Sequence, residues 1–209
     1  MNQKKYWDSM ADEKEFTAPL DVKRFKKYVK KNALILDLGC GYGRTLHQLK
    51  QIGYNNLTGI DFSEKMILRG HRLFPEIKME VMHDDYKLPN DYFDAVILFA
   101  VLTCIENNDE QKNLIANIFN TLNKNGIIYI SDFLLNNDPR NLERYNKYQA
   151  KYTNYGTFEL ENGAILRHHA KKWLNELLKD FKTIEYGETQ FKTMNRNTSN
   201  AFLYFGKKE

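Results

Sequence analysis

The stretch Ile35-Leu36-Asp37-Leu38-Gly39-Cys40-Gly41-Tyr42-Gly43 decides the fold of this 209-residue chain. A short apolar run, residues 34–38, ends in three glycines at alternate positions. Apolar residues then recur at helical spacing over residues 46–52, and Gly53 is a typical helix stop. The pattern predicts a strand, a tight glycine turn and a helix. Such a turn presents backbone N–H groups and a helix N-terminus to a ligand, and glycine lets the ligand approach the backbone closely.

The spacing of the glycines distinguishes two kinds of nucleotide site. A dinucleotide fingerprint, G-x-G-x-x-G, would place its third glycine at position 44. Arg44 stands there, and the chain follows G-x-G-x-G instead. This pattern resembles the first motif of class I S-adenosylmethionine (SAM) methyltransferases. A second predicted strand, Leu57 to Asp61, ends on an acid 20 positions after Gly41. At about that separation an acid bonds the ribose hydroxyls of a bound nucleoside.

Three further predicted strands extend the resemblance. They are expected at residues 77–82, 92–99 and 127–131, each at the place of a family motif. The five motifs, in family order, cover residues 33–134. Helices are expected between the strands, after Ser63 as N-cap at residues 64–74 and after Asn108 as N-cap at residues 109–122. This alternation predicts the α/β class, a mostly parallel sheet with helices on both faces.

The remainder of the chain is expected to complete that sheet. Two extended runs, 157–160 and 164–168, flank Glu161-Asn162-Gly163, which predicts a hairpin. A helix near 170–179 and strands near 182–191 and 201–206 follow. The resemblance implies a Rossmann-like seven-stranded sheet of order 3-2-1-4-5-7-6 with strand 7 antiparallel. The chain is interpreted as a single domain, 1–209, made of an N-terminal cap (1–31), a SAM-binding core (33–134), a lid with the hairpin insert (136–169) and a segment that completes the sheet (170–209).

The resemblance also implies which residues hold SAM. The glycines let the backbone approach the methionine moiety and ribose, Asp37 faces the ammonium group, and Asp61 takes the ribose hydroxyls. Helix capping or a surface ion pair is the alternative for each acid. An aromatic face at Trp7 would attract the sulfonium charge, or Trp7 is a core anchor. The full predicted cofactor site is Tyr6, Asp37, Gly39, Cys40, Gly41, Gly43, Asp61, Phe62 and Met66 beside the adenine, Asp84 for its amino group, Asp85 as a neighbouring backbone donor, and Phe99.

Candidate catalytic residues lie at the end of the hairpin insert. They are Arg167, His168 and His169. Histidine is the usual general base near neutral pH, and arginine can bind a carboxylate or phosphate through two hydrogen bonds. The alternative is that one histidine points outward and the other caps the next helix. A run of tyrosines over 145–155 either walls an aromatic acceptor pocket or forms the core of the lid, and Asn195 is a weaker candidate for binding the acceptor.

The net charge of +4 falls entirely in residues 1–31, which carry nine Lys/Arg against five Asp/Glu. This segment is either a phosphate-binding face or the solvated side of an amphipathic helix. The helix is favoured, because Leu20, Phe25, Tyr28 and Val29 supply an apolar side. No basic and aromatic pattern of a nucleic-acid module accompanies the charge, so a nucleic-acid partner is not expected.

Taken together, the sequence predicts a SAM-dependent methyltransferase that acts on a small molecule and resembles the ubiquinone/menaquinone-type group. SAM is the expected cofactor and no metal is expected. The rival interpretations are an RNA methyltransferase and a SAM-binding regulator without catalysis. The Asn/Asp-Pro-Pro-aromatic motif of amino-methylating enzymes is absent after strand four, where Phe99-Ala100-Val101-Leu102 stands.

Composition adds expectations about the compartment. Cys40 and Cys104 suit a reducing cytoplasm, because two cysteines form no disulfide or metal framework. Neither a membrane span nor a secretion leader is expected. Abundant Lys, Asn and Ile suggest an AT-rich bacterial genome. Monomer and homodimer both remain open.

Overall fold

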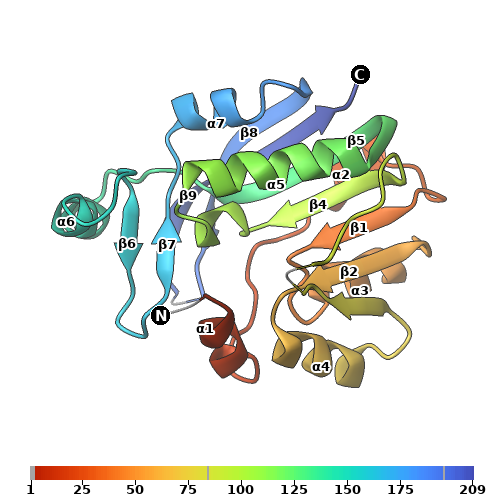
Figure 1. Ribbon diagram of the computed structural model, residues 1–209, viewed down its shortest axis with the longest axis horizontal. Coiled ribbons are helices and arrows are strands. Elements are labelled where there is room, and N and C mark those ends of the chain that lie inside the picture. The colour runs from red at the N-terminus through yellow and green to blue at the C-terminus, as the bar shows by residue number, and fades with distance from the viewer. Residues whose placement is uncertain (1–2, 84, 195) are drawn as a thin grey trace.

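A twisted seven-stranded sheet forms the centre of the computed structural model, which describes residues 3–83, 85–194 and 196–209 (Figure 1). Its first strand, β1 (Ile35–Leu38), is buried along its whole length, as expected for a strand covered on both faces. The other parallel strands pair around it as predicted, with bounds β2 (Leu57–Asp61), β3 (Lys78–Val81), β4 (Phe93–Phe99) and β5 (Leu122–Phe133).

The C-terminal part of the chain completes this sheet. Strand β9 (Thr198–Lys207) lies antiparallel between β5 and β8 (Lys182–Lys192). The short strands β6 (Thr157–Glu159) and β7 (Ile165–Arg167) pair only with each other, as the predicted hairpin. Strands β8 and β9 are therefore the sixth and seventh of the main sheet. The order β3-β2-β1-β4-β5-β9-β8 confirms the predicted topology, antiparallel strand included.

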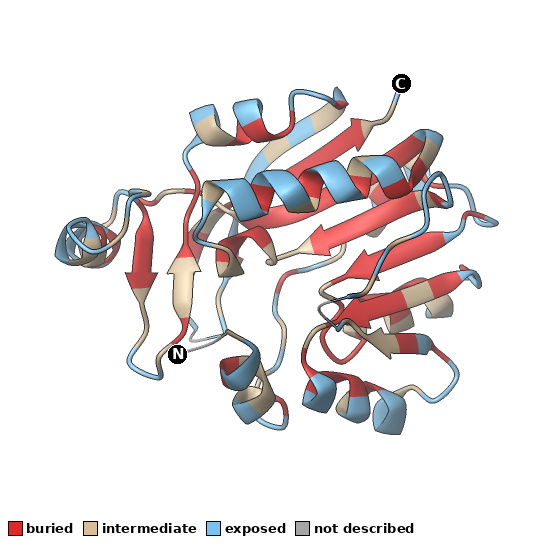
Figure 2. Cartoon of the chain, in the orientation of Figure 1, coloured by how far each residue is buried: buried red, intermediate tan, exposed pale blue. Residues whose placement is uncertain are grey.

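Helices cover both faces of the sheet, and apolar clusters lie between the layers (Figure 2). On one face, α2 (Val22–Tyr28), α3 (Arg44–Gln51) and α4 (Glu64–Leu73) bury residues such as Phe25 and Leu46. On the other face, α5 (Asn108–Thr121) and α7 (Lys171–Leu177) bury Ile118 and Leu174. Among the described residues, no helix is long and apolar enough to cross a membrane.

One helix cap was predicted correctly and the other was wrong by one residue. Ser63 caps α4, since its Oγ accepts a hydrogen bond from the Met66 amide at 3.2 Å. The cap of α5 is Asn107 and not Asn108, because the Asn107 Oδ1 accepts from the Asp109 and Glu110 amides at 2.7 and 3.1 Å. Asn108 is the first helical residue, and its Oδ1 accepts instead from Arg167 Nη1 at 2.7 Å.

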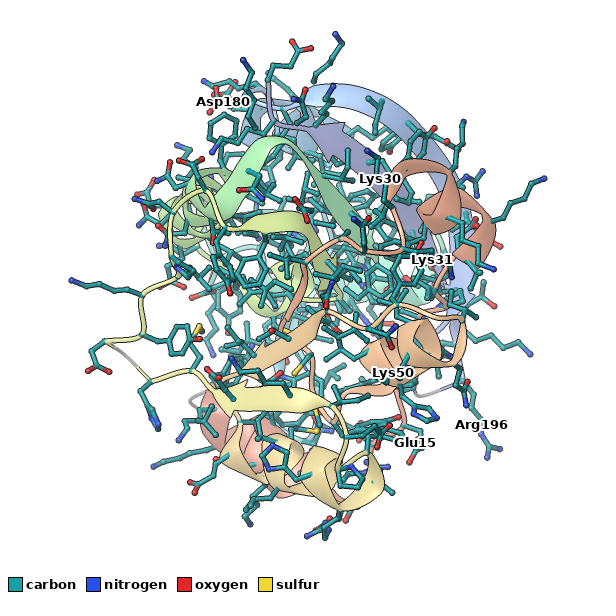
Figure 3. The ribbon with its side chains drawn as sticks, turned by 90° about the vertical axis from the view of Figure 1, so that its right-hand side faces the viewer. Glu15, Lys30, Lys31, Lys50, Asp180 and Arg196 are labelled. Atoms are coloured by element: carbon teal, nitrogen blue, oxygen red, sulfur yellow. The ribbon has the colours of Figure 1, made fainter. Side chains whose placement is uncertain are left out.

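The basic N-terminal segment forms an amphipathic helix, as favoured from its sequence. Phe25 and Val29 are buried at 0% and 4% exposure. Lys30 and Lys31 are exposed beyond the end of α2, on the same side of the molecule as Lys50 (Figure 3).

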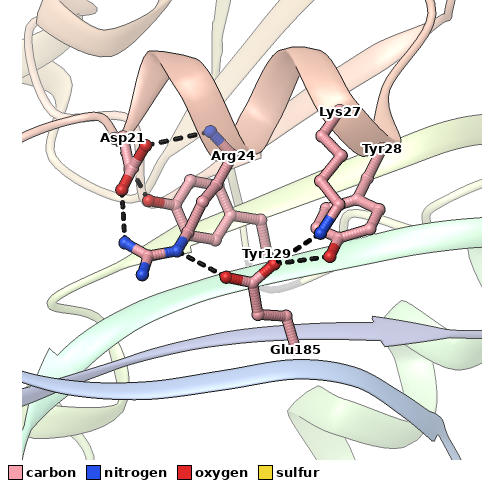
Figure 4. Close-up of polar contacts among 6 residues, drawn as sticks. All are labelled: Asp21, Arg24, Lys27, Tyr28, Tyr129 and Glu185. Carbon is pink, nitrogen blue, oxygen red and sulfur yellow. Dashed lines mark hydrogen bonds and ion pairs between the residues drawn. The ribbon is translucent and has the colours of Figure 1, made fainter.

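Polar contacts fasten α2 to the edge strand β8 (Figure 4). The carboxylate of Glu185 accepts from Arg24 Nε at 2.6 Å and from the Tyr28 hydroxyl at 2.5 Å, with Lys27 Nζ at 3.4 Å. The hydrogen bond from Tyr28, followed by that from Arg24, lowers the pKa of Glu185 to about 2. The helix therefore docks through an ion-pair network as well as through Phe25.

The hairpin insert lies beside the carboxyl ends of the central strands, next to α6 (Pro139–Tyr148) (Figure 1). The Thr103 Oγ1, in the 3-10 helix η1 (Leu102–Cys104) after β4, donates to the Arg167 carbonyl at 2.9 Å. A single parallel bridge also joins Leu134 to His169. The insert is thus placed at the edge of the sheet where ligands bind in α/β folds.

Candidate active site

A cavity of about 340 Å³ lies at the carboxyl ends of β1, β2 and β4. Strand order reverses between β1 and β4, and open α/β sheets bind ligands at such a switch point. Eight predicted site residues line the cavity: Asp37, Gly39, Cys40, Gly41, Asp61, Phe62, Met66 and Phe99.

The glycine turn after β1 shapes the floor of the cavity. Gly39 and Gly41 have φ angles of +78° and +55°, a left-handed conformation that favours glycine. A Cβ atom at Gly39 would collide with Val101, and one at Gly41 would collide with the ring of Phe16. Gly43 was also predicted to approach the cofactor, but it is not among the described lining residues. It lies at the N-cap of α3, where a side chain would collide with the sulfur of Met79, so close helix packing is the reason for glycine there.

Asp61, the last residue of the neighbouring strand β2, binds the glycine turn through its carboxylate. Its Oδ2 accepts from the Gly41 amide and its Oδ1 from the Ser63 amide, both at 2.8 Å. Burial raises the pKa of Asp61 to about 6, while these two amides favour the charged form. A carboxylate held in this way keeps lone pairs free for ligand hydroxyl groups.

Asp37 and Arg44 bring opposite charges to the same wall. Asp37 is 2% exposed, and burial raises its pKa to about 7 against the opposing charge of Arg44. Arg44, the first residue of α3, donates through Nη2 to the Ala18 carbonyl, and its buried Nε has no partner among the described residues. A carboxylate and a guanidinium side by side suit a zwitterionic ligand group. Arg44 was noticed in the sequence only as a missing glycine, although its place directly after the turn was a usable signal.

The N-terminal segment, residues 3–18, roofs the cavity. Gln3, Trp7 and Phe16 line it, and Trp7 and Phe16 form an edge-to-face pair with ring centroids 6.0 Å apart. Tyr6 was expected to bind the cofactor, but it is buried beside the hairpin, and its hydroxyl accepts from Asn162 Nδ2 at 3.3 Å. Helical spacing explains the correction, because Tyr6 and Trp7 are adjacent in α1 (Gln3–Met10) and their side chains point about 100° apart, so only one of the two faces the cavity.

Arg69 of α4 holds the roof in place. Its Nη1 donates to the carbonyl oxygens of Ala11 and Lys14 at 2.8 and 2.7 Å, and its Nη2 pairs with Glu15. The guanidinium also lies 4.0 Å from the ring centroid of Tyr42. Arg69 is therefore the most extensively bonded of the side chains that attach the roof to the α4 side of the cavity, beside the Ser63–Asp8 hydrogen bond and the Arg72–Asp12 ion pair.

The three candidate catalytic residues are buried away from the cavity. His168 Nδ1 lies 2.5 Å from the Tyr145 hydroxyl and 3.2 Å from Asn136 Nδ2, and His169 Nδ1 lies 3.2 Å from the Phe133 carbonyl. Burial lowers the pKa of both histidines to about 3, so they are neutral at pH 7. Arg167 is 4% exposed and donates to the Glu106 carbonyl at 2.9 Å. Their contacts hold the hairpin in place, and we assign them no catalytic role.

The tyrosines of residues 145–155 and Asp85 also lie apart from the cavity. Tyr145 is fully buried in the hairpin core. No described residue of the segment 136–169 lines the cavity, so this segment does not form the predicted acceptor wall. Asp85 is exposed and is not among the described lining residues. Asp84 and Asn195 lie outside the described residues, although Met194, beside Asn195, does line the cavity.

Asp132 is a structural residue of the site that the sequence interpretation missed. It is 1% exposed, and its oxygens accept from the Thr103 amide at 3.2 Å and the Phe133 amide at 2.7 Å. These bonds fix η1 against the end of β5. Burial raises the pKa of Asp132 to about 7. The sequence signal that could have revealed Asp132 is a carboxylate that only Ser131 separates from the apolar run Ile127–Ile130 of β5.

Residues 35–126 match the family model of a methyltransferase domain. Over 83 residues, 39% of this chain, the sequence is 31% identical to the ribosomal protein L11 methyltransferase of Aquifex aeolicus. The chain spans about a third (34%) of the length of that relative.

Solved structures show the same fold. A SAM-dependent methyltransferase from Methanosarcina mazei superposes with a TM-score of 0.83 at 21% identity, over 91% of this chain and 98% of the other. The 1,6-didemethyltoxoflavin-N1-methyltransferase of Burkholderia thailandensis, solved with bound S-adenosylhomocysteine (SAH), gives a TM-score of 0.64 at 16% identity, over 89% and 75% of the two chains. Residues 35–126 therefore match a methyltransferase domain, and the chain has the fold of solved SAM-dependent methyltransferases. The fold class predicted from the glycine turn is confirmed.

Proposed function

We propose that this protein transfers the methyl group of SAM to a small-molecule acceptor. The observation that carries the proposal is the enclosed cavity, because its roof of residues 3–18 is bonded to both sides of the site. Arg69 holds the roof to α4, and Gln3 Nε2 donates to the Ile165 carbonyl of the hairpin at 2.5 Å. A cavity of about 340 Å³ is at the lower end of the range for small-ligand sites, about 300–1,000 Å³.

The cavity walls offer a partner for each group of SAM, which supports the proposal. We assign the ribose hydroxyls to Asp61, the methionine ammonium to Asp37 and the methionine carboxylate to the unpartnered Nε of Arg44. The adenine would lie among the apolar side chains of Phe62, Met66 and Met82. Bound SAM supplies an electrophilic methyl group on a sulfonium, so the protein contributes mainly orientation and electrostatics.

A small acceptor is favoured over an RNA or protein acceptor by the roof. A polymer could reach the cavity only if residues 3–18 moved away and exposed Trp7 and Phe16 to water. Burying these rings again would recover about 25 cal/mol per Å² of apolar surface, which favours the closed arrangement. Free Cys40 and Cys104 favour the reducing cytoplasm as the compartment.

The test has two arms. Calorimetry should show binding of SAM and of SAH but no binding of NAD. With radiolabelled SAM, methyl incorporation should appear in a low-molecular-mass metabolite extract and not in RNA or ribosomal protein fractions. Absence of SAM binding would overturn the whole proposal, whereas label in RNA or protein would overturn the small-molecule acceptor.

A further inference from the structure

The half of the cavity left for the acceptor is apolar. If SAM lies on the β1 and β2 side as proposed above, the remaining walls come from the ends of β4 and β5, the roof and the β8–β9 loop. Their apolar members are Trp7, Phe99, Ile105, Phe133 and Met194, and their polar members are Gln3, Thr17 and Cys104. We call these eight residues the acceptor half.

None of these eight residues can take a proton from an acceptor at neutral pH. The amide of Gln3 and the hydroxyl of Thr17 are not bases. The thiol of Cys104 is the only group of the acceptor half that titrates in proteins, and burial raises its pKa far above neutrality, with the nearby Asp132 adding to the shift. Cys104 therefore stays protonated.

Other ionisable residues at the cavity are already engaged or lie at its edge. Across the described lining residues these are Asp37, Asp61, Arg44, Glu110 and Cys40, whose thiol stays protonated because burial raises its pKa well above the usual value. The first three are assigned to SAM, and Glu110 is exposed on the first turn of α5. His168 and His169, the usual kind of base, are bonded elsewhere in the hairpin core.

We propose that the acceptor is a small apolar molecule that brings its own nucleophile, a thiol or a comparably acidic hydroxyl that reacts as its anion. The acceptor loses its proton to solvent before it binds. A lone pair of the anion then forms the bond to the methyl carbon, and the electron pair of the broken carbon–sulfur bond stays on the sulfur of SAH. Both products are neutral at the reacting atoms, so no protein group has to receive a proton.

Electrostatics favours an anionic acceptor beside the sulfonium of SAM in an apolar cavity. Coulomb attraction between two charges about 4 Å apart grows several-fold when water is excluded. An anionic acceptor is therefore drawn to the sulfonium inside walls made of Phe99, Phe133 and Met194. A neutral alcohol gains no such attraction, and no described residue of the acceptor half can act as a base to activate it. An alkylamine arrives protonated at neutral pH and is repelled by the same sulfonium, whereas an arylamine such as aniline is neutral and gains no attraction.

The test uses thiophenol, 4-nitrophenol and phenol, which share one ring and differ in acidity. With SAM saturating, kcat/KM is measured against pH for each. We expect the midpoint of each profile to follow the pKa of the acceptor. Thiophenol should react roughly tenfold or more faster than phenol at pH 7, because an aryl thiol is a much stronger acid than a phenol, whose pKa is about 10. Calorimetry of thiophenol with the enzyme–SAH complex gives a readout that is independent of turnover, and binding should weaken below the pKa of the thiol.

Glu110→Gln tests whether the exposed carboxylate at the edge of the cavity acts as a base. This variant should leave the three profiles of kcat/KM against pH unchanged. One common midpoint for all acceptors, loss of the rate in Glu110→Gln, or faster methylation of aniline than of thiophenol would each overturn the inference. SAM binding without methylation of any probe would also overturn it. Failure to bind SAM would instead overturn the proposed function, so the two failures are distinguishable. If the enzyme methylates thiophenolate but neither phenolate, the acceptor atom is sulfur. If it methylates a phenolate but not thiophenolate, the acceptor atom is oxygen.

Discussion

At the scale of single residues, the site combines two buried carboxylates with different surroundings. Asp61 accepts two backbone amides, whereas no hydrogen bond to the Asp37 side chain is found among the described residues. Burial raises the pKa of both, to about 6 for Asp61 and about 7 for Asp37. Asp61 is therefore prearranged as an anion, and Asp37 gains its charge most readily when a cation arrives.

Replacing Asp61 tests the ribose assignment. Asp61→Asn keeps the shape of the side chain but removes charge-assisted hydrogen bonds, each contributing about 1.5–3 kcal/mol. We expect SAM binding to weaken by roughly 10- to 100-fold, as measured by calorimetry. Asp180→Asn, at an exposed position, is the matched control (Figure 3). Unchanged affinity in Asp61→Asn would remove Asp61 from the cofactor site.

Asp37 should make SAM binding depend on pH. The ammonium of SAM favours the charged carboxylate, so binding lowers the pKa of Asp37 from about 7 and releases a proton. Affinity should therefore fall by up to about tenfold per pH unit as pH drops below 7, and level off above it. Calorimetry in buffers with different ionisation enthalpies measures the proton release, and Asp37→Asn should abolish it. Equal proton release in both proteins would contradict the assignment.

The same raised pKa has a consequence for the stability of the protein without cofactor. Between about pH 4 and pH 7 the folded state holds more protons at Asp37 than the unfolded state does. The contribution of this group to stability is therefore complete below the unfolded pKa and is lost as pH rises through about 7. Asp37→Asn should accordingly raise the melting temperature at pH 8 while it weakens SAM binding.

At the scale of elements, residues 3–18 cover the cavity, whereas the hairpin, which was expected to be a lid, contributes no described lining residue. The roof segment reaches over the glycine turn, and its Phe16 stacks on Tyr42 with ring centroids 5.0 Å apart. The hairpin contacts η1 through the Arg167 carbonyl, and His169, which follows the hairpin, contacts Gln111 of α5. Any opening of the site for ligands therefore falls to residues 3–18.

Two arginines of α4 allow a matched test of the roof. Arg69 has 11% of its side chain exposed and four roof or ring contacts, whereas Arg72 is 66% exposed and pairs with Asp12 alone. Arg69→Lys should speed the release of SAM several-fold and increase hydrogen exchange in residues 3–18. Arg72→Lys should change neither quantity measurably, because an exposed ion pair contributes about 0–1 kcal/mol. Equal behaviour of the two variants would show that Arg69 does not hold the roof.

At the scale of the whole molecule, the last strand in the sequence is not at the edge of the sheet. β9 lies between β5 and β8, and its Phe202 and Phe205 are fully buried, one in each of the two apolar clusters. Both helical layers therefore depend on side chains of β9.

Removing residues 198–209 should unfold the protein rather than leave a smaller folded domain. The deletion breaks the pairing of β5 with β9 and of β9 with β8, and it exposes both clusters. Loss of a buried Phe side chain alone costs about 3–5 kcal/mol, against a typical total stability of 5–15 kcal/mol. Circular dichroism should show no cooperative thermal transition, whereas a chain lacking only the exposed Glu209 should melt like the full chain. A cooperative transition in the longer deletion would show that β9 is dispensable.

Local patterns in the sequence determined the strands of the sheet, the glycine turn and Asp61. Buried strands, glycines at alternate positions and an Asn-Gly turn are governed by interactions within a few residues, and the family resemblance then ordered the strands. Boundaries were correct to within a few residues for the same reason, with the cap of α5 displaced from Asn108 to Asn107.

Only the tertiary structure decided which distant side chains share the cavity. Arg167, His168 and His169 had suitable chemistry, but their burial and hydrogen bonds are set by α5, β5 and α6, elements far away in sequence. The position of Arg44 on the same cavity as Asp37, and the roof formed by Trp7 and Phe16, likewise depend on how helices dock on the sheet. Burial, and with it charge state and access to a ligand, is a property of the packed molecule, so residue type and spacing along the chain could not reveal it.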